Sequence, residues 1–327
     1  MMLVGISGNR LKAEDKDLLA QKHVGGVILF DWNMKNPKQV TKLNKQVQER
    51  GALTINQQSI PLFIAVDEEG GYVARMCDKW PDGKIPSQET IGLTGNPQLA
   101  KEWSKKVGRS LKTMGFNLNF APVADLGMPS ERSYSKDSSK VTNFVDAAMD
   151  GYAEEKIISC LKHFPGIGKA VVDSHIDGSA INANLETLEK DDLIPFTKMI
   201  ATKDHIGFMV MISHLSYPAL DTENPSSLSK NIITDLLKGK LKYQGLVITD
   251  DLEMGAVAKH YSFEEMGVRA IKAGVDIALV CHEYKHILAV REGLLKAVRA
   301  GEISEAGIDE SVKKILKTKL TILQAIN

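Results

Sequence analysis

Short runs of apolar residues recur along the whole chain. They lie at 24–30, 61–67, 118–125, 157–164, 208–214, 245–251 and 276–281, and MLVGIS near the start forms an eighth. Each run is too short for a helix, and polar residues rarely interrupt it. Strands that are covered on both faces of a parallel sheet have this pattern. We therefore predict eight parallel strands.

The stretches between these runs have helical periodicity. In residues 97–115 an apolar residue recurs at every fourth position opposite a row of lysines: Leu99, Trp103, Val107 and Leu111. The last such stretch, 304–323, starts at Ser304, a residue type that caps helices well. Alternating strands and helices without a Gly-, Ser- or Pro-rich linker predict a single (β/α)8 TIM-type barrel over residues 1–327. A doubly wound open sheet is the alternative.

The composition narrows the class of partner. Of the 327 residues, 43% are hydrophobic and 25% are charged, which is the balance of an ordinary globular protein. Lys plus Arg and Asp plus Glu number 41 each, so no long-range field favours nucleic acid or an anionic membrane. We expect a small or neutral partner and a monomer, and we expect neither a metal nor another cofactor.

The expected cellular compartment follows from features that the sequence lacks. The apolar N-terminus has no basic segment before it and no membrane-length apolar run follows, so we expect neither a signal peptide nor a membrane span. The three cysteines, Cys77, Cys160 and Cys281, have no metal-binding spacing. Reduced, buried cysteines indicate the cytoplasm. An exported form that has lost its leader is the alternative.

Polar residues close five of the predicted strands. They are Asp67, Asp125, Lys162 with His163, His214, and Asp250 with Asp251. In a barrel the carboxyl ends of the strands surround one pocket. Any one of these aspartates could simply cap the following helix. Five such endings together predict a polar site at the barrel mouth.

The stretch KHFPGIGKAVVDSH, residues 162–175, resembles a phosphate-binding loop only in its middle. That motif requires Gly where this chain has His163, and Ser or Thr where it has Ala170. The chemistry is therefore expected at the two ends of the stretch. Asp173 and His175, two positions apart, can act as an acid/base pair in which the carboxylate orients the imidazole. A surface turn that hydrogen-bonds to itself is the alternative for this pair.

Two adjacent carboxylates close the strand at 245–251. Successive side chains of a strand point in opposite directions, so we expect Asp250 and Asp251 to have different roles, one in the pocket and one capping the next helix. A carboxylate nucleophile and a histidine acid/base are the groups that double-displacement cleavage of a glycoside needs. The usual scheme employs two carboxyl groups, and a histidine in place of one departs from it.

These residues occur in motifs that resemble glycoside hydrolase family 3, and within it the NagZ-type β-N-acetylglucosaminidases that act on peptidoglycan fragments. The motifs are VDEEGGYVARM (66–76), GFNLNFAPVADL (115–126), RSYSKD (132–137), KHFPG (162–166), DSH (173–175) and VITDDLEM (247–254). The resemblance covers nearly the whole chain. Relatives that act on plain glucosides generally carry a second α/β sandwich domain with a Glu acid/base; this chain has DSH instead and is expected to lack that domain.

The resemblance implies a role for each motif residue. Asp250 is expected to be the nucleophile, and His175 the acid/base with Asp173 as its partner. The residues expected to hold the non-reducing sugar are Asp67, Arg75, Arg132, Lys162 and His163. The implied activity is that of a retaining exo-β-N-acetylglucosaminidase (β-hexosaminidase) on peptidoglycan or chitin fragments, as in peptidoglycan recycling.

Two departures and several alternatives accompany this prediction. The chain has Ile167 where relatives commonly read PGHG, and Tyr72 where many read EGGRV. The histidine acid/base also suggests a phosphorylase that accepts phosphate, and a β-glucosidase is a further alternative. A metal-dependent barrel hydrolase usually needs an HxH pair, which the sequence lacks. The remaining alternatives are a Schiff base at Lys162 and a sugar-binding barrel without catalysis.

Overall fold

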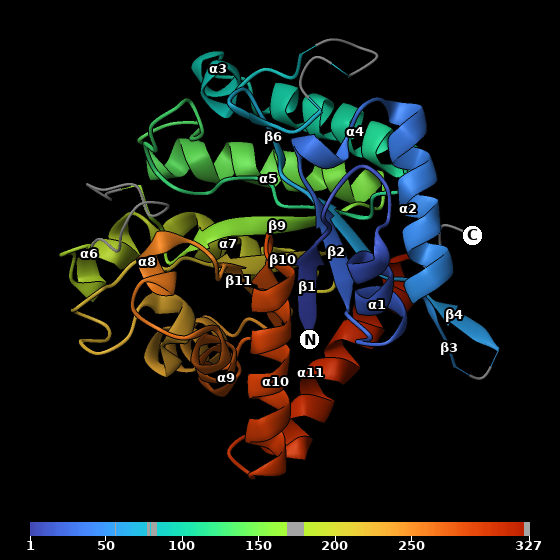
Figure 1. Cartoon of the computed structure of the whole chain (residues 1–327). Coiled ribbons are helices and arrows are strands. Elements are labelled where there is room, and N and C mark those ends of the chain that lie inside the picture. The colour runs from blue at the N-terminus through green and yellow to red at the C-terminus, as the bar shows by residue number, and fades with distance from the viewer. Residues whose placement is uncertain (56, 77–78, 80–83, 169–179, 324–327) are drawn as a thin grey trace.

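The structure, a computed structural model, describes residues 1–55, 57–76, 79, 84–168 and 180–323. Within these residues eight parallel strands close into a barrel in the order β1-β12-β11-β10-β9-β8-β5-β2 (Figure 1). Their bounds are β1 Met2–Gly5, β2 Gly26–Leu29, β5 Phe63–Val66, β8 Leu118–Asn119, β9 Ile158–Phe164, β10 Phe208–Ile212, β11 Leu246–Asp251 and β12 Ile277–Val280. All eight predicted strands are confirmed. The open-sheet alternative is wrong, because β1 pairs with both β2 and β12.

Helices surround the barrel (Figure 1). The α-helices are α1 Ala13–Ala20, α2 Pro37–Gly51, α3 Gln88–Leu93, α4 Pro97–Thr113, α5 Ser138–Glu154, α6 Leu185–Lys190, α7 Leu193–Thr202, α8 Gly255–Ala258, α9 Phe263–Ala273, α10 Tyr284–Arg299 and α11 Glu305–Thr318. Short 3-10 helices are η1 Asp31–Asn33 and η3 Ser226–Leu228, and π-helical segments are η4 Asn231–Lys240 and η5 Lys319–Leu323. Two small antiparallel pairs were not predicted: β3 Leu53–Ile55 with β4 Gln58–Ile60, and β6 Glu68–Gly70 with β7 Val73–Ala74.

The helix starts follow local capping chemistry. Asn36, Asp137 and Ser304 each accept a hydrogen bond from a backbone N–H in the first turn of α2, α5 and α11. The expected cap at Ser304 is therefore confirmed. The expected cap by an aspartate after β11 is wrong, because α8 begins after Met254. No described helix is both long and apolar enough to cross a membrane.

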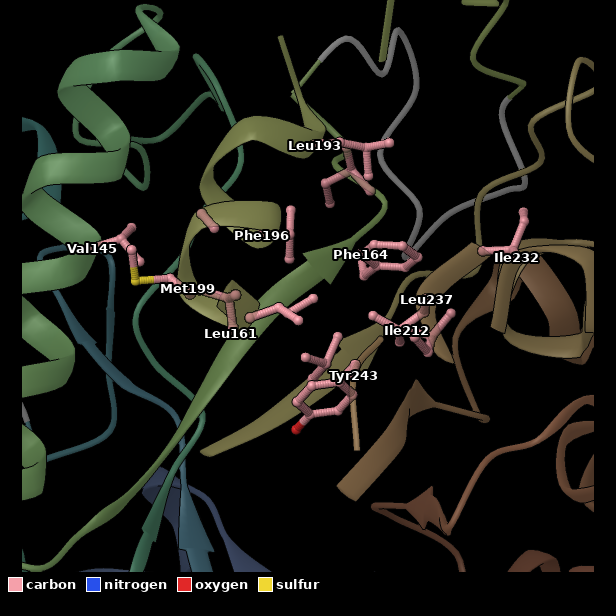
Figure 2. Packing of buried hydrophobic residues seen from close by; sticks show 14 of the residues in the cluster. Val145, Leu161, Phe164, Leu193, Phe196, Met199, Ile212, Ile232, Leu237 and Tyr243 are labelled. Carbon is pink, nitrogen blue, oxygen red and sulfur yellow. The ribbon is translucent and has the colours of Figure 1, made fainter. Parts of the chain in front are cut away.

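The strands are apolar throughout because both faces are buried. In β10, Met209 and Met211 pack inside the barrel, whereas Val210 and Ile212 point outward to the helices. The outer layer between β9, β10 and the helices contains aromatic and aliphatic side chains such as Phe164, Phe196 and Tyr243 (Figure 2). Burying such side chains contributes roughly 1.5–3 kcal/mol each. Cys160 and Cys281 are buried and unpaired, as expected, and Cys77 lies outside the described residues.

The C-terminal segment closes the amino-terminal end of the barrel. The expected helix over 304–323 is α11 followed by the π-helical η5, whose Leu323 joins the cluster inside the barrel. Lys319 Nζ donates a hydrogen bond to Gly25 O at 2.8 Å and lies 4.8 Å from the centre of the Phe63 ring. Burial lowers the pKa of Lys319 to about 7. The opposite end of the barrel therefore remains as the mouth.

Candidate active site

Strand alternation directs three of the predicted site residues into the barrel mouth. On β5, Phe63 and Ala65 point inward, so Asp67 continues the inward series. On β9, Ile158 and Cys160 precede Lys162 with the same spacing, and on β11, Leu246 and Ile248 precede Asp250. Each charged residue thus takes the next inward position after the last apolar layer. This register explains why polar residues at these strand ends share one space.

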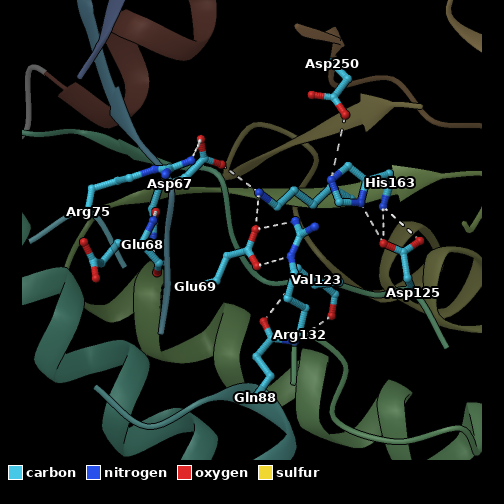
Figure 3. Close-up of polar contacts among 12 residues, drawn as sticks. Asp67, Glu68, Glu69, Arg75, Gln88, Val123, Asp125, Arg132, His163 and Asp250 are labelled. Carbon is cyan, nitrogen blue, oxygen red and sulfur yellow. Dashed lines mark hydrogen bonds and ion pairs between the residues drawn. The ribbon is translucent and has the colours of Figure 1, made fainter. Parts of the chain in front are cut away.

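The centre of the site is a network of buried ion pairs (Figure 3). Lys162 Nζ lies 2.7 Å from Asp67 Oδ1 and 2.6 Å from Glu69 Oε1. Glu69 also accepts two hydrogen bonds from Arg132, each of 2.8 Å, through Nε and Nη2. Lys162 is only 2% exposed. Buried charges require such partners, because an unpaired charge in this environment would be very costly.

The network fixes the protonation states of its members. Burial alone would raise the pKa of Glu69, but the charges of Lys162 and Arg132 hold it well below its usual range. Burial alone would lower the pKa of Lys162, but the carboxylates of Asp67 and Glu69 outweigh it and raise that pKa. Lys162 is therefore an ammonium ion near neutral pH. Such a group can donate hydrogen bonds to hydroxyl oxygens but cannot act as a nucleophile.

Arg75 extends the network toward β2. Its Nη2 lies 3.9 Å from Asp67 Oδ2, and its guanidinium carbon lies 5.3 Å from the centre of the Phe30 ring. Arg75 Nε is buried and has no hydrogen-bond partner among the residues that the structure describes. A guanidinium with an unused donor next to a carboxylate suits the recognition of a hydroxylated ligand.

His163, the residue after Lys162, lies beside Asp250. Its Nδ1 lies 2.7 Å from Asp125 Oδ2, and Asp125 also accepts hydrogen bonds from the backbone N–H groups of His163 and Ile167. A carboxylate only accepts, so Nδ1 carries the proton and Nε2 points toward the mouth. His163 Nε2 lies 3.9 Å from Asp250 Oδ2 (Figure 3). Asp125 thus positions His163 beside Asp250.

Asp250 and Asp251 point in different directions, as expected. Burial alone would raise the pKa of Asp250, but His163 and the N–H of Asp251, which donates to Asp250 Oδ1 at 2.8 Å, contribute to a net lowering. Asp251 Oδ1 instead accepts hydrogen bonds from the N–H groups of Glu253 and Cys281. Burial lowers the pKa of His214, whose Nε2–H donates to Asp251 O. Asp250 is therefore an anion at the mouth, and Asp251 is a structural residue.

The structure brings most of the predicted site together. Asp67, Arg75, Arg132 and Lys162 join one ion-pair network through Glu69, and His163, which follows Lys162 in the chain, contacts Asp250 in a second group. The predicted pair Asp173 and His175 lies outside the described residues. Glu69, which joins Arg132 to Lys162, received no role from the sequence, and Asp125, which holds His163, was expected at the mouth only as one of the polar strand ends. The sequence signal for Glu69 was its position two residues after Asp67, a spacing at which the side chains of an extended segment share a face.

Gly166 and Gly168 let the chain turn after β9. Gly166 has a φ of 119°, which other residues rarely adopt. A Cβ on Gly168 would lie 1.7 Å from Leu126 O. The two glycines therefore allow the chain to turn tightly beside the β8 loop. Of the expected departures, Ile167 is buried and its N–H donates to Asp125, and Tyr72 is 81% exposed at the β6–β7 turn.

One group of described residues has donors close enough for a metal ion. Carboxylate oxygens of Asp251 and Glu253 and a ring nitrogen of His282 lie within 4.8 Å of one another. These donors already have protein partners: Asp251 Oδ2 lies 3.1 Å from His282 Nε2, and Glu253 Oε1 accepts from the Glu283 N–H and contacts His286 Nδ1. The group therefore has a sufficient structural role without a metal.

Comparison with known proteins identifies the family. Residues 1–318 match the glycosyl hydrolase family 3 N-terminal domain. The chain is 32% identical to a β-hexosaminidase of Haemophilus influenzae, over 90% of this chain and 82% of that protein. Beta-hexosaminidase A of Pseudoalteromonas piscicida is 29% identical over 96% of this chain.

Solved structures have the same fold. A family 3 β-N-acetylglucosaminidase from Paenibacillus sp. str. FPU-7 superposes with a TM-score of 0.92 and 35% identity over 99% of this chain. This chain spans 61% of that Paenibacillus chain and 56% of the Pseudoalteromonas protein. The match over 318 residues and the ion-pair network at the barrel mouth lead to one assignment. The chain belongs to glycosyl hydrolase family 3, whose N-terminal domain it contains.

Proposed function

We propose that this chain is a retaining exo-acting β-N-acetylglucosaminidase, a β-hexosaminidase that removes a non-reducing terminal sugar. The observation that carries the proposal is the ionised Asp250 carboxylate beside a network of charged hydrogen-bonding groups at the barrel mouth. The names of the similar proteins support the same activity. Residues 1–327 are proposed to form one catalytic domain that acts as a monomer in the cytoplasm, on chitin or peptidoglycan fragments.

In the first proposed step Asp250 attacks the anomeric carbon. Oδ1 accepts the Asp251 N–H, whereas Oδ2 faces His163 at the mouth, so Oδ2 is the attacking oxygen. The bond between the anomeric carbon and the leaving oxygen breaks as the new carbon–oxygen bond forms. His175, oriented by Asp173, gives its proton to the leaving oxygen. This acid role is supported by the sequence motif, since both residues lie outside the described part of the structure.

In the second step water replaces Asp250. His175 takes a proton from the water, the oxygen bonds to the anomeric carbon, and Asp250 leaves as a carboxylate. Two displacements retain the configuration. Asp67, Arg75, Arg132, Lys162 and His163 are proposed to hold the sugar hydroxyls and the acetamido group, because charged donors and acceptors alternate around the mouth. A Schiff base at Lys162 is disfavoured, since its neighbours raise its pKa.

The proposal is tested by matched substrates and variants. The wild type should hydrolyse an aryl β-N-acetylglucosaminide much faster than the corresponding β-glucoside. Asp250→Ala should abolish turnover, whereas Asp309→Ala, an exposed aspartate on α11, should not change it. An adduct trapped with a slow, fluorinated acetamido-sugar substrate should add the mass of that fluorinated sugar to a peptide that contains Asp250, which would identify the nucleophile.

His175→Ala tests the acid role separately. An activated leaving group needs little protonation, so the first step should be partly rescued with dinitrophenol but not with a sugar leaving group. An equal loss for all leaving groups would contradict the acid assignment. Turnover that persists in Asp250→Ala would contradict the whole mechanism.

A further inference from the structure

The barrel mouth has a second side that the proposed sugar contacts do not occupy. Those contacts come from β5, β9, β11 and the loop with Arg132. Apart from the end of β10, the rest of the rim is formed by the ends of β2, β1 and β12, which are neighbours in the barrel. A cavity of about 510 Å³ lies there, within the range of small-molecule sites. Its lining includes Ser7, Trp32, His282 and Tyr284.

Aromatic rings form one wall of this cavity. Trp32, in η1 just after β2, stacks on Phe30 with ring centres 4.5 Å apart and an interplanar angle of 7°. The His282 ring lies 5.7 Å from Trp32 and 5.3 Å from Phe30. Trp32 is 47% exposed although it is a large apolar residue. A rigid, exposed ring of this kind offers a flat surface to the C–H face of a sugar at little entropic cost.

The wall continues directly from the proposed site. Phe30 follows the inward position of Ile28 on β2, and Arg75 lies over its ring. Arg75 in turn faces Asp67, which pairs with Lys162. Side-chain contacts therefore connect Asp67, at the proposed sugar position, with Trp32 through Arg75 and Phe30. This continuity is the ground for placing a second sugar beside Trp32.

The other wall is held in place by residues at the end of β11 and just after it. Asp251 Oδ2 contacts His282 Nε2, and Glu253 accepts hydrogen bonds from the N–H groups of His282 and Glu283. Asp251 is adjacent to Asp250, so the position of His282 is fixed relative to the proposed nucleophile. This wall is thus held in place by Asp251, the residue next to Asp250, and by Glu253.

The charge of the cavity lining selects the kind of ligand. Three carboxylates, Glu14, Asp15 and Glu283, line it, against one lysine, Lys285. Any charge on His282 is offset by its partner Asp251. A leaving group that carries a carboxylate would therefore meet repulsion, whereas a neutral sugar would not.

We propose that Trp32 and His282 form a leaving-group subsite that selects a neutral second amino sugar, as in chitin fragments, over a muramic-acid unit with its lactyl carboxylate. This inference rests on the proposed function and names its substrate class. Stacking on Trp32 stabilises the second sugar, and the acidic lining excludes the anionic one.

Three substrates test the subsite. They share β-N-acetylglucosamine and differ in the leaving group: a second N-acetylglucosamine, N-acetylmuramic acid, or methanol, which is too small to reach Trp32. Trp32→Ala should lower kcat/KM for the chitin disaccharide by about 3- to 10-fold and leave the methyl glycoside nearly unchanged. Trp32→Phe should restore most of the loss. Leu53→Ala, at a 45% exposed position on the distant β3–β4 pair, should affect neither substrate.

A second variant tests the effect of the acidic cavity lining. The wild type should prefer the neutral disaccharide to the muramic-acid one, and Glu283→Gln should narrow that preference. An equal effect of Trp32→Ala on the disaccharide and the methyl glycoside, or a wild-type preference for the anionic disaccharide, would overturn the inference.

A binding measurement separates this inference from the proposed activity. In the Asp250→Ala background, Trp32→Ala should weaken binding of the chitin disaccharide by about 3- to 10-fold but not binding of free N-acetylglucosamine. Equal affinities with and without Trp32 would refute the subsite. A wild type that hydrolyses none of the three substrates would refute the proposed activity instead.

Discussion

Glu69→Gln is the substitution that tests the ion-pair network most directly. Gln has nearly the same shape as Glu but no charge. Both carboxylate oxygens of Glu69 contact Arg132 or Lys162 at 2.6–2.8 Å, and the side chain is 1% exposed. In the variant, Asp67 is the remaining carboxylate paired with Lys162. Arg132 loses its bidentate carboxylate partner.

The expected cost is large because the pair is buried. Removing one partner of a buried ion pair typically costs about 3–5 kcal/mol, since the other charge stays desolvated. We expect a loss of this size in the free energy of unfolding at pH 7. We also expect a lower kcat/KM, because Arg132 and Lys162 would no longer be held where the sugar is proposed to bind.

The pH dependence of this loss follows from the lowered pKa of Glu69. The folded pKa lies below the unfolded value of about 4.3, so the stabilisation is fully present above that value. It is lost as the pH falls below the unfolded value toward the folded one. The difference in unfolding free energy between wild type and Glu69→Gln should therefore be constant from pH 7 to about pH 5 and shrink below about pH 4.3.

Urea unfolding at pH 7, 5 and 3.5 measures this difference. Glu154→Gln is the matched control, because Glu154 also contacts two cations, Lys101 and Lys105, but at the surface. The control should cost much less. The reasoning would be refuted if Glu69→Gln cost no more than the control, or if its cost did not change between pH 7 and pH 3.5.

Other substitutions test the supporting contacts. Asp125→Asn should lower the free energy of unfolding by about 1.5–3 kcal/mol and reduce kcat/KM, because the ring and backbone N–H of His163 lose a charged acceptor; unchanged values in both assays would contradict its positioning role. Gly168→Ala should destabilise the fold by about 1–3 kcal/mol in thermal unfolding, because the new Cβ meets Leu126 O, whereas Gly8→Ala, with no such contact, should have little effect. Incubation with a chelator should leave the rate of glycoside hydrolysis unchanged, and a loss that zinc restores would favour a metal-dependent hydrolase.

The strands and the inward direction of their last residues were predictable from the sequence. Runs such as 245–251 show burial on both faces, and alternation then places Asp250 in the series of Leu246 and Ile248. The same alternation along β9 places Lys162 in the inward series of Ile158 and Cys160. These are local patterns, and local patterns are what a single sequence displays.

The pairing of charges was not predictable in the same way. Glu69 and Arg132 lie 63 positions apart, and Asp125 and His163 lie 38 apart. These contacts exist only once the barrel has closed, so no spacing in the sequence reveals them. The contact made by the π-helical η5 was equally unpredictable, because Lys319 donates a hydrogen bond to Gly25, 294 positions earlier in the chain.

The pairing of β1 with β12 bears on how the protein is made. One edge of β1 pairs with β2, but its other edge stays open until β12, which ends at Val280, has been made. Only after that can η5 cover the amino-terminal end of the barrel. During synthesis the nascent chain therefore exposes an open sheet edge until β12 has been made. Ribosome-bound fragments that stop before β12 should be open to proteases and dependent on chaperones, and native resistance should emerge only once β12 and η5 have left the ribosome.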